Sequence, residues 1–173
     1  MHVAVANTEE MVEGLAKRRF DLAIISLPVV DDRLTITPLF KEELLVLQHS
    51  ERPLQGWRVG NVERAELSKQ PFLLYPPESN MRKMIDRHFS ELGIVPRVAI
   101  EAADTEVLVR MVEAGFGQGI LPENALRRSP RYYRVMRIEN RRLLREQALA
   151  ALSISRSRPL TVEISKFLQA SLR

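Results

Sequence analysis

The chain of 173 residues contains no cysteine. Without thiols it cannot form disulfide bonds, thiolate zinc sites or iron–sulfur clusters, and it has no cysteine nucleophile. A reducing, cytoplasmic setting fits this composition best. Aromatic residues are also scarce, at 6% of the chain. Their scarcity argues against a surface on which the bases of single-stranded nucleic acid would stack.

Long apolar runs are missing as well. None approaches the length needed to cross a bilayer, and the first residues lack the basic and apolar regions of a secretory signal. We therefore expect no membrane segment and no export. At 45% hydrophobic and 28% charged residues, the composition is typical of a globular protein that buries a substantial core.

Features of catalytic and metal sites are few. The chain has three histidines, and none has a second ligand-type residue at metal-binding spacing, so we expect no metal and no cofactor. His88 lies beside the apolar face of a predicted helix, which favours a structural role. The stretch from Gly115 to Gly119 follows a helix and precedes a strand, the reverse of the order in a dinucleotide loop. With no nucleophile elbow or phosphate-binding loop either, we expect no enzyme.

The net charge of +4 comes mainly from arginine. One interpretation is a nucleic-acid footprint, and the other is a solvated face of alternating strand positions. The second is favoured, because no helix-turn-helix, zinc-finger or RNA-binding motif accompanies the charge. The pairs Asp31-Asp32 and Glu42-Glu43 would face opposite sides of a strand, which indicates surface charge or salt bridges. The clustered arginines are Arg127, Arg128, Arg131, Arg134, Arg137, Arg141, Arg142 and Arg145.

The opening of the chain has the pattern of a β-α-β unit. The apolar run Val3–Val5 predicts a strand, and Asn7-Thr8 predicts the start of a helix because a capping side chain precedes acidic residues. Phe20–Leu27 is nearly continuously apolar, which is typical of a strand buried on both faces in a parallel sheet. Further elements are predicted as strands at Leu34–Leu39 and Glu43–Leu47 and a loop at 48–60.

The same pattern starts again after Leu67. Several predicted elements end or begin at a residue suited to that place: Gly93 and Gly115 end helices, and Asp104 caps one. A final helix at Leu160–Leu172 is expected to turn Ile164, Phe167 and Leu168 inward. The other predicted strands are Pro71–Tyr75, Val98–Glu101, Phe116–Leu121, Arg134–Ile138 and Gln147–Ser155, with a brief helix from Pro122 to Leu126.

Two β-α-β blocks indicate an α/β fold with two lobes and a ligand crevice between them. Ligands of such sheets bind beyond the carboxyl ends of the strands, where loops lead into helix N-termini. Three stretches lie where such a loop leads into a predicted helix, at Asn7-Thr8, Glu78–Asn80 and Ala103–Thr105. Their backbone N–H groups and small polar side chains suit a small anion or polar metabolite.

Five stretches, taken in order, carry a resemblance to a known family. They are NTEEMVEGLAKRRFDLAIISLP (Asn7 to Pro28), PLFKEELLVL (Pro38 to Leu47), PFLLY (Pro71 to Tyr75), RKMIDRHFSELGIVP (Arg82 to Pro96) and MVEAGFGQGILPENAL (Met111 to Leu126). In this order they resemble the effector-binding domain of LysR-type transcriptional regulators. The resemblance extends over essentially the whole chain, and MVEAGFGQGILP is its most specific part.

The resemblance implies a two-lobed fold like that of type 2 periplasmic binding proteins. Residues 1–47 with 153–173 would form the first lobe and residues 48–152 the second. A small-molecule effector, such as an organic anion, would bind in the crevice and alter how a homodimer or tetramer binds promoter DNA. No membrane partner is implied. A solute-binding protein of a transport system is the alternative with the same fold. The implied effector-binding residues are Asn7, Thr8, Leu27, Pro28, Ser79, Asn80, Asp104 and Thr105.

The sequence departs from the family pattern at its beginning. It lacks the helix-turn-helix and linker helix that precede the domain, so contact with promoter DNA would require a DNA-binding domain absent from this chain. It also lacks the domain's usual first strand and first helix. We therefore expect an incomplete first lobe. The sequence names neither the effector nor the target genes, and it does not distinguish an activator from a repressor.

Overall fold

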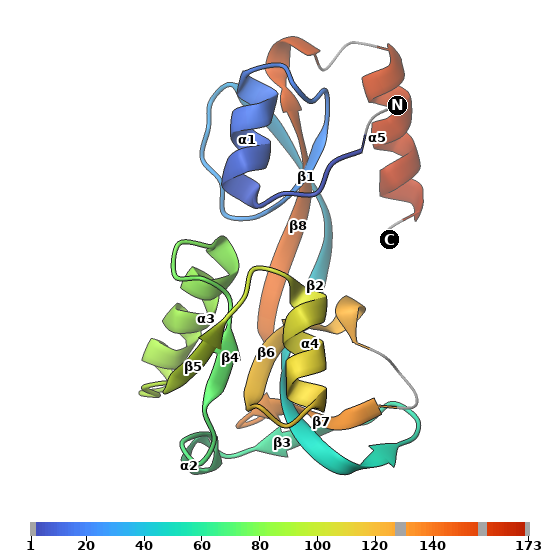
Figure 1. The fold of residues 1–173 in the computed structure, drawn as a ribbon. Helices are drawn as coiled ribbons and strands as arrows, with labels where there is room; N and C mark the ends of the chain where they lie inside the picture. Colours follow the sequence, from blue (N-terminus) through green and yellow to red (C-terminus); the bar gives the residue numbers. More distant parts are fainter. Residues whose placement is uncertain (1–2, 127–130, 156–158, 172–173) are drawn as a thin grey trace. The chain divides into compact units, whose positions relative to one another are not determined.

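The computed structural model describes residues 3–126, 131–155 and 159–171, which form a mixed α/β structure (Figure 1). The helices are α1 (Thr8–Ala16), α2 (Arg64–Leu67), α3 (Asn80–Glu91), α4 (Thr105–Glu113) and α5 (Pro159–Ser171), with short 3-10 turns η1 (Glu123–Ala125) and η2 (Ser153–Ser155). The strands are β1 (Ala23–Ser26), β2 (Leu34–Leu54), β3 (Val59–Val62), β4 (Phe72–Leu74), β5 (Val98–Glu101), β6 (Gln118–Pro122), β7 (Arg131–Ile138) and β8 (Leu143–Leu152).

The chain divides into two compact units. Unit 1 consists of residues 1–42 and 145–173, and unit 2 of residues 43–144. The described strands form one eight-stranded sheet in the order β1-β8-β2-β6-β4-β5, and β7 pairs with both β2 and β3. β2 and β8 each run from one unit into the other. The lobe boundaries that the sequence predicts, after residues 47 and 152, stay a prediction.

In unit 1, α1 packs on the strand pair β1 and β8. Leu15 of α1, Ile25 of β1 and Ala148 of β8 are fully or almost fully buried in one apolar cluster. β1 is antiparallel to β8, with Ser26 opposite Gln147. Ile24, which points to the other side of β1, is 44% exposed. The prediction of a parallel strand buried on both faces is therefore wrong, because the apolar cluster with α1 takes only alternate residues of β1.

Two further predictions for unit 1 are also wrong. Val3–Val5 is not a strand, and Val3 and Val5 are 75% and 97% exposed, because no described strand pairs with this segment. Phe167 does not turn inward and is 67% exposed. Ile164 and Leu168 are one helical turn apart and define the partly buried face of α5, which leaves Phe167 at its margin.

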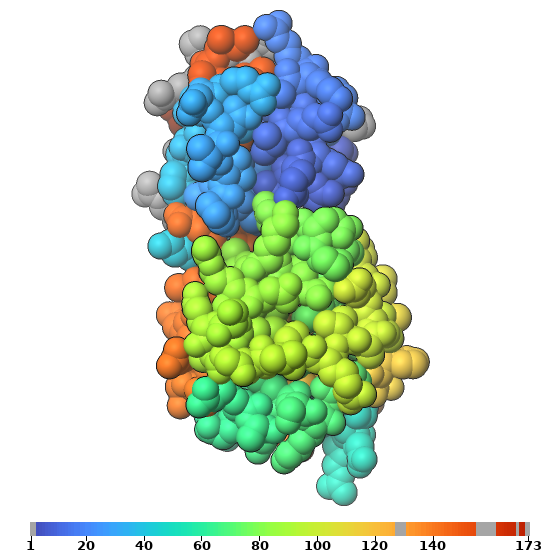
Figure 2. All heavy atoms as spheres, turned by 90° about the vertical axis from the view of Figure 1, so that its left-hand side faces the viewer, coloured from blue at the N-terminus to red at the C-terminus, as the bar shows by residue number. Residues whose placement is uncertain are grey.

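Unit 2 has its core around the parallel strands β4, β5 and β6 and the helices α3 and α4. β4 is parallel to both β5 and β6. Ile85 and Phe89 of α3 and Leu108 and Val112 of α4 are buried in one cluster with the sheet. In Figure 2 the α3 segment, coloured green, occupies much of the visible face of this unit. These strands and helices confirm the second β-α-β block.

Three glycines of unit 2 are explained by the local geometry of the backbone. Gly93 and Gly115 have φ angles of +65° and +82°, which other residues rarely adopt, and they end α3 and α4 as predicted. At Gly117 a Cβ would lie 2.6 Å from the carbonyl oxygen of Pro71. That carbonyl accepts a hydrogen bond from Gln118 N, which aligns β6 beside β4. The close approach of the two backbones therefore requires glycine.

Some strand boundaries differ from those predicted. The two strands expected at Leu34–Leu39 and Glu43–Leu47 form the single strand β2, which continues through part of the expected loop to Leu54. β8 begins earlier than predicted and ends at Leu152, where η2 starts. A continuous strand is favoured because β2 pairs with β8 as well as with β6 and β7.

The arginine cluster is not simply a solvated face. Arg131 is 3% exposed and lies over the Trp57 ring, with 5.6 Å between its guanidinium carbon and the ring centroid. Arg137 and Arg145 form ion pairs with buried glutamates, described below. Arg134, Arg141 and Arg142 are exposed, whereas Arg127 and Arg128 lie outside the described residues. The prediction fails for the buried members because a planar guanidinium can be buried when an aromatic face or a carboxylate pairs with it.

Candidate functional site

In unit 1, the start of α1 brings two predicted site residues to the end of β1. Asn7 caps the helix, and its Oδ1 accepts a hydrogen bond of 2.8 Å from Glu10 N. Thr8 Oγ1 accepts a bond of 3.3 Å from Ser26 N. Leu27 and Pro28 follow Ser26 directly, with Leu27 partly buried and Pro28 exposed. The start of α1 thus lies beside the end of β1, whereas ligand binding by these four residues stays a prediction.

Polar contacts continue from the start of α1 across the strands of unit 1. Ser26 Oγ lies 3.5 Å from Gln147 Oε1 of β8. Gln147 Nε2 donates a hydrogen bond of 3.2 Å to Glu42 Oε1 of β2, and Glu42 also accepts hydrogen bonds from Arg145. We call Thr8, Ser26, Gln147, Glu42 and Arg145 the unit 1 cluster. It connects a predicted site residue with a buried ion pair.

Glu42 and Glu43 bind arginines separately. Glu42 pairs with Arg145, whereas Glu43 receives a bidentate bond from Arg137, with Nε to Oε1 and Nη2 to Oε2 both at 2.7 Å. The hydrogen bonds that Arg137 donates to Glu43 raise the pKa of Arg137. Salt bridging is confirmed for this pair of glutamates. Surface exposure is wrong, because they are 8% and 2% exposed.

In unit 2, the start of α3 is capped by a predicted site residue. Ser79 Oγ accepts a hydrogen bond of 3.1 Å from Arg82 N and donates one of 2.9 Å to the Pro76 carbonyl. Asn80, the first residue of α3, is partly exposed. These contacts fix the turn between β4 and α3.

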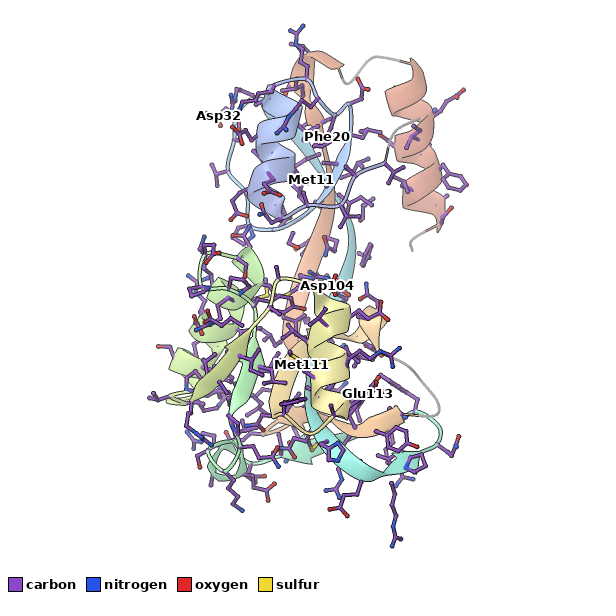
Figure 3. The ribbon with its side chains drawn as sticks, in the orientation of Figure 1. Met11, Phe20, Asp32, Asp104, Met111 and Glu113 are labelled. Carbon is purple, nitrogen blue, oxygen red and sulfur yellow. The ribbon has the colours of Figure 1, made fainter. Side chains whose placement is uncertain are left out.

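The start of α4 lies beside the end of β4. Asp104 caps α4, with Oδ1 accepting a bond of 3.0 Å from Val107 N. Figure 3 shows Asp104 at the beginning of this helix, with Met111 and Glu113 farther along it. The next residue, Thr105, shares a hydrogen bond of 2.8 Å with the hydroxyl of Tyr75, which follows β4 and is 4% exposed. The prediction that the polar helix starts gather at strand ends is therefore met in this unit.

Arg82 joins the elements around Tyr75. Its Nη1 donates to the Tyr75 carbonyl at 2.9 Å and to Glu101 Oε1 at 2.8 Å, and its Nε donates to Asp86 at 3.0 Å. Burial alone would lower the pKa of Arg82, but the hydrogen bonds to Glu101 and Asp86 outweigh it and raise the pKa. We call Tyr75, Ser79, Arg82, Glu101 and Thr105 the unit 2 cluster.

Sequence reasoning missed most members of these clusters. Ser26, Glu42, Arg145 and Gln147 in unit 1 and Tyr75, Arg82 and Glu101 in unit 2 were not predicted as site residues. A signal exists for one of them, because an arginine in the first turn of a helix is unfavourable unless carboxylates neutralise it. The role of the eight predicted residues in ligand binding stays a prediction.

The described residues contain no group of three or more His, Asp or Glu side chains arranged to hold a metal ion. His88 is 9% exposed on α3, and burial lowers its pKa. Within the same residues, no helix has both the length and the apolar character needed to cross a membrane. The candidate site therefore consists of hydroxyl, amide, carboxylate and guanidinium groups.

Comparison with known proteins gives a family match over residues 1–173, to the LysR substrate binding domain. Among curated proteins, the chain is 28% identical to the HTH-type transcriptional regulator BenM of Acinetobacter baylyi over 117 residues, which are 66% of this chain and 38% of BenM. It is also 28% identical to the transcriptional dual regulator GltC of Bacillus subtilis, over 66% of this chain and 38% of GltC. The chain thus spans about two fifths of the length of these relatives.

Solved structures share the fold. The regulatory domain of CcmR from Synechocystis PCC6803, in complex with 2-PG, matches 96% of this chain and 80% of its own, with a TM-score of 0.82 and 21% identity. The effector-binding domain of QuiR, in complex with shikimate, matches 96% of this chain and 78% of its own, with a TM-score of 0.78 and 22% identity.

Proposed function

Because the chain belongs to the LysR substrate-binding domain family, we propose that it is the ligand-sensing part of a LysR-type transcriptional regulator. In this role it binds a small molecule, and the bound molecule changes how the regulator acts on promoter DNA. The observation that carries the proposal is that each unit gathers small polar side chains where a helix starts beside a strand end. The relatives described above are regulators, and nothing in them favours the transport alternative.

The proposed effector is a small polar metabolite, and an organic anion fits the helix starts. Backbone N–H groups there favour negative charge, and hydroxyl side chains favour hydrogen-bonding ligands. The proposed effector-binding residues are the eight predicted from the sequence, Asn7, Thr8, Leu27, Pro28, Ser79, Asn80, Asp104 and Thr105. A ligand does regulatory work only if it binds one conformation more tightly than another. We therefore propose that contacts of the effector with these residues supply that difference in affinity.

The partners follow from the same proposal. The regulator would act in the cytoplasm as a homodimer or tetramer and would contact promoter DNA through a DNA-binding domain outside this sequence. The greater length of BenM and GltC leaves room for such a domain in those proteins. In solution the chain alone is expected to give no sequence-specific complex with duplex DNA at physiological salt.

Thermal unfolding against a panel of small metabolites tests the proposal. A ligand at one hundred times its Kd adds about 2.7 kcal/mol to the free energy of unfolding, which is a visible rise in Tm. Thr8→Val and Ser79→Ala should then weaken binding of that ligand by about tenfold each, as loss of one hydrogen bond predicts. Calorimetric titration well below Tm measures the affinity.

Matched controls separate the site from general effects. Thr37→Val changes the same residue type elsewhere in unit 1, and Ser90→Ala changes an exposed serine of α3. Both should leave the affinity within about twofold, because neither residue is at a helix start. If no compound stabilises the protein, the sensor proposal fails. If a compound binds and neither site variant weakens it, the assignment of Thr8 and Ser79 fails.

A further inference from the structure

Glu42 is a buried carboxylate with only one of its two oxygens paired. Its side chain is 6% exposed, and Oε1 accepts hydrogen bonds from Arg145 Nε, Arg145 Nη2 and Gln147 Nε2. Oε2 is buried and has no hydrogen-bond partner. A buried carboxylate oxygen without a donor is costly, and such a group in a native structure calls for an explanation.

Its neighbour Glu43 shows what a saturated carboxylate looks like at almost the same place in the fold. Both oxygens of Glu43 accept from Arg137, and Arg142 Nε lies 3.5 Å from Oε2. Glu43 is buried to a similar degree. Burial beside arginines therefore does not by itself leave an oxygen unpaired, and the free Oε2 is particular to Glu42.

We propose that Glu42 determines effector specificity and that its Oε2 accepts a hydrogen bond from a hydroxyl or ammonium group of the effector. This inference rests on the proposed function. It adds a residue to the predicted site and names a chemical feature of the ligand. The effector would carry at least one hydroxyl or ammonium donor, in addition to any acidic group held at the helix starts.

The contacts within unit 1 connect Glu42 to the proposed effector-binding residues. Glu42 bonds to Gln147, Gln147 lies against Ser26, and the backbone of Ser26 donates to Thr8. Glu42 is also the last residue of unit 1 before β2 enters unit 2. These contacts lead from Thr8 through polar groups of three strands to Glu42, whose Oε2 is the free acceptor.

The charges of the clusters favour a donor-bearing ligand. Arg145 is paired with Glu42, and Arg82 is paired with Glu101 and Asp86. A ligand that offers only an anionic group has to compete with these carboxylates for the arginines. A ligand hydroxyl or ammonium instead meets an acceptor that has no partner. Sites built to pair with a ligand donor discriminate strongly against the analogue that lacks it, because the protein group then stays unpaired.

Pairs of compounds that differ only in donor groups provide the test. Shikimate is compared with cyclohex-1-ene-1-carboxylate, malate with succinate, and aspartate with succinate, within the metabolite panel. The first two pairs probe hydroxyl donors and the third probes ammonium. We expect the donor-bearing member of at least one pair to bind the wild-type protein about tenfold more tightly or better. Calorimetric titration of the wild-type protein measures this preference without any variant.

Glu42→Gln then assigns the preference to its residue. The amide keeps an oxygen for Arg145 and Gln147 but puts a donor in the place of Oε2, so the preference should fall to about threefold or less. Glu43→Gln is the matched control, since it alters the neighbouring buried carboxylate and should keep the preference. Circular dichroism and thermal unfolding establish that both variants are folded. If Glu42→Gln does not fold, the wild-type comparison still tests the expected donor preference, and its absence overturns the inference.

Each outcome bears on a different claim. If no compound of the panel binds the wild-type protein, the proposed function fails, and the Glu42 inference fails with it. If compounds bind but donor-free members bind as tightly as their partners, the sensor survives and the Glu42 inference fails. Retention of the preference in Glu42→Gln, or its equal loss in Glu43→Gln, also overturns the role of Glu42.

Discussion

The two polar clusters are built from similar residues but differ in how tightly they are held. In unit 2 the hydrogen bond between Tyr75 and Thr105 and the two donated by Arg82 Nη1 are 2.8–2.9 Å long, and they join α3, α4 and the ends of β4 and β5. In unit 1 the contacts of Thr8, Ser26 and Gln147 are 3.2–3.5 Å long, Arg145 Nε donates to Glu42 Oε1 at 2.8 Å, and Glu42 Oε2 remains unpaired. The unit 2 cluster is preorganised, whereas the unit 1 cluster keeps hydrogen-bonding capacity.

Under the proposed function, this difference would give the two clusters different tasks. Rigid groups lose little entropy when a ligand binds, so a preorganised cluster would support affinity. Groups with unused acceptors gain hydrogen bonds only when the correct ligand is present, so a cluster with a free acceptor would support discrimination. We therefore expect substitutions in the unit 2 cluster to lower stability more than substitutions in the unit 1 cluster.

The largest effect is expected for Arg82→Met, which would loosen the unit 2 cluster. The change leaves the Tyr75 carbonyl and Glu101 without their donor, and loss of a largely buried charged partner costs about 2–3 kcal/mol of unfolding free energy. Urea denaturation measures the loss. Arg87→Met, at an exposed position of the same helix, is the control and should cost less than about 0.5 kcal/mol. Equal losses in the two variants would contradict a tightly held cluster.

The next largest loss of unfolding free energy is expected when the hydroxyl of Tyr75 is removed, and removal of the Ser26 hydroxyl is the comparison. Tyr75→Phe removes the partner of Thr105 and should cost about 1 kcal/mol, because the hydrogen bond is short and the tyrosine is buried. Ser26→Ala removes a contact of 3.5 Å and should cost less than about 0.5 kcal/mol. Denaturation curves of the two variants measure both values. A greater loss for Ser26→Ala would reverse the assignment of the two clusters.

The smallest effect concerns pH and unit 2. Burial lowers the pKa of His88, so the folded state favours the neutral imidazole. The contribution of His88 to the free energy of unfolding is complete above its ordinary pKa of about 6.5. It is lost as the pH falls toward the lower pKa that His88 has in the folded state, because the unfolded chain takes up the proton first. The free energy of unfolding of unit 2 should drop by less than about 1 kcal/mol between pH 7 and pH 5.

Trp57, the single tryptophan, lies in unit 2 and reports its unfolding by fluorescence. His88→Gln should reduce the slope of the tryptophan-detected stability between pH 7 and pH 5. An unchanged slope would mean that other groups cause the acid sensitivity of unit 2.

Unit 2 was the more predictable part of the fold for a physical reason. Its strands and helices alternate along the chain, and local residues set their limits, as Asp104 does at the start of α4 and Gly93 and Gly115 do at helix ends. Unit 1 depends on β8, whose Gln147 lies 121 residues from Ser26. Local patterns do not reveal such a partner. The apolar run of β1 therefore indicated a strand but not its antiparallel neighbour.

The candidate site divides in the same way. Residues at helix starts could be predicted, because Asn7, Ser79 and Asp104 are capping types that precede apolar periodicity. The unit 1 cluster could not, because Glu42 and Gln147 are 105 residues apart and meet only through the pairing of strands. In the sequence, Glu42 and Glu43 are an adjacent pair that indicated surface charge or salt bridges. The structure shows that both are buried, and the unused oxygen of Glu42 distinguishes it from Glu43.

The division of unit 1 into residues 1–42 and 145–173 has a consequence for biosynthesis. On the ribosome the whole of unit 2 emerges before β8 does. Unit 2 is a continuous stretch of the chain, so it can fold while the nascent chain is still growing. β1 must wait for β8, and during that interval its apolar residues are available to chaperones or to other nascent chains. Slower translation after residue 144 would lengthen this vulnerable interval, which makes the synthesis rate there a determinant of the yield of folded protein.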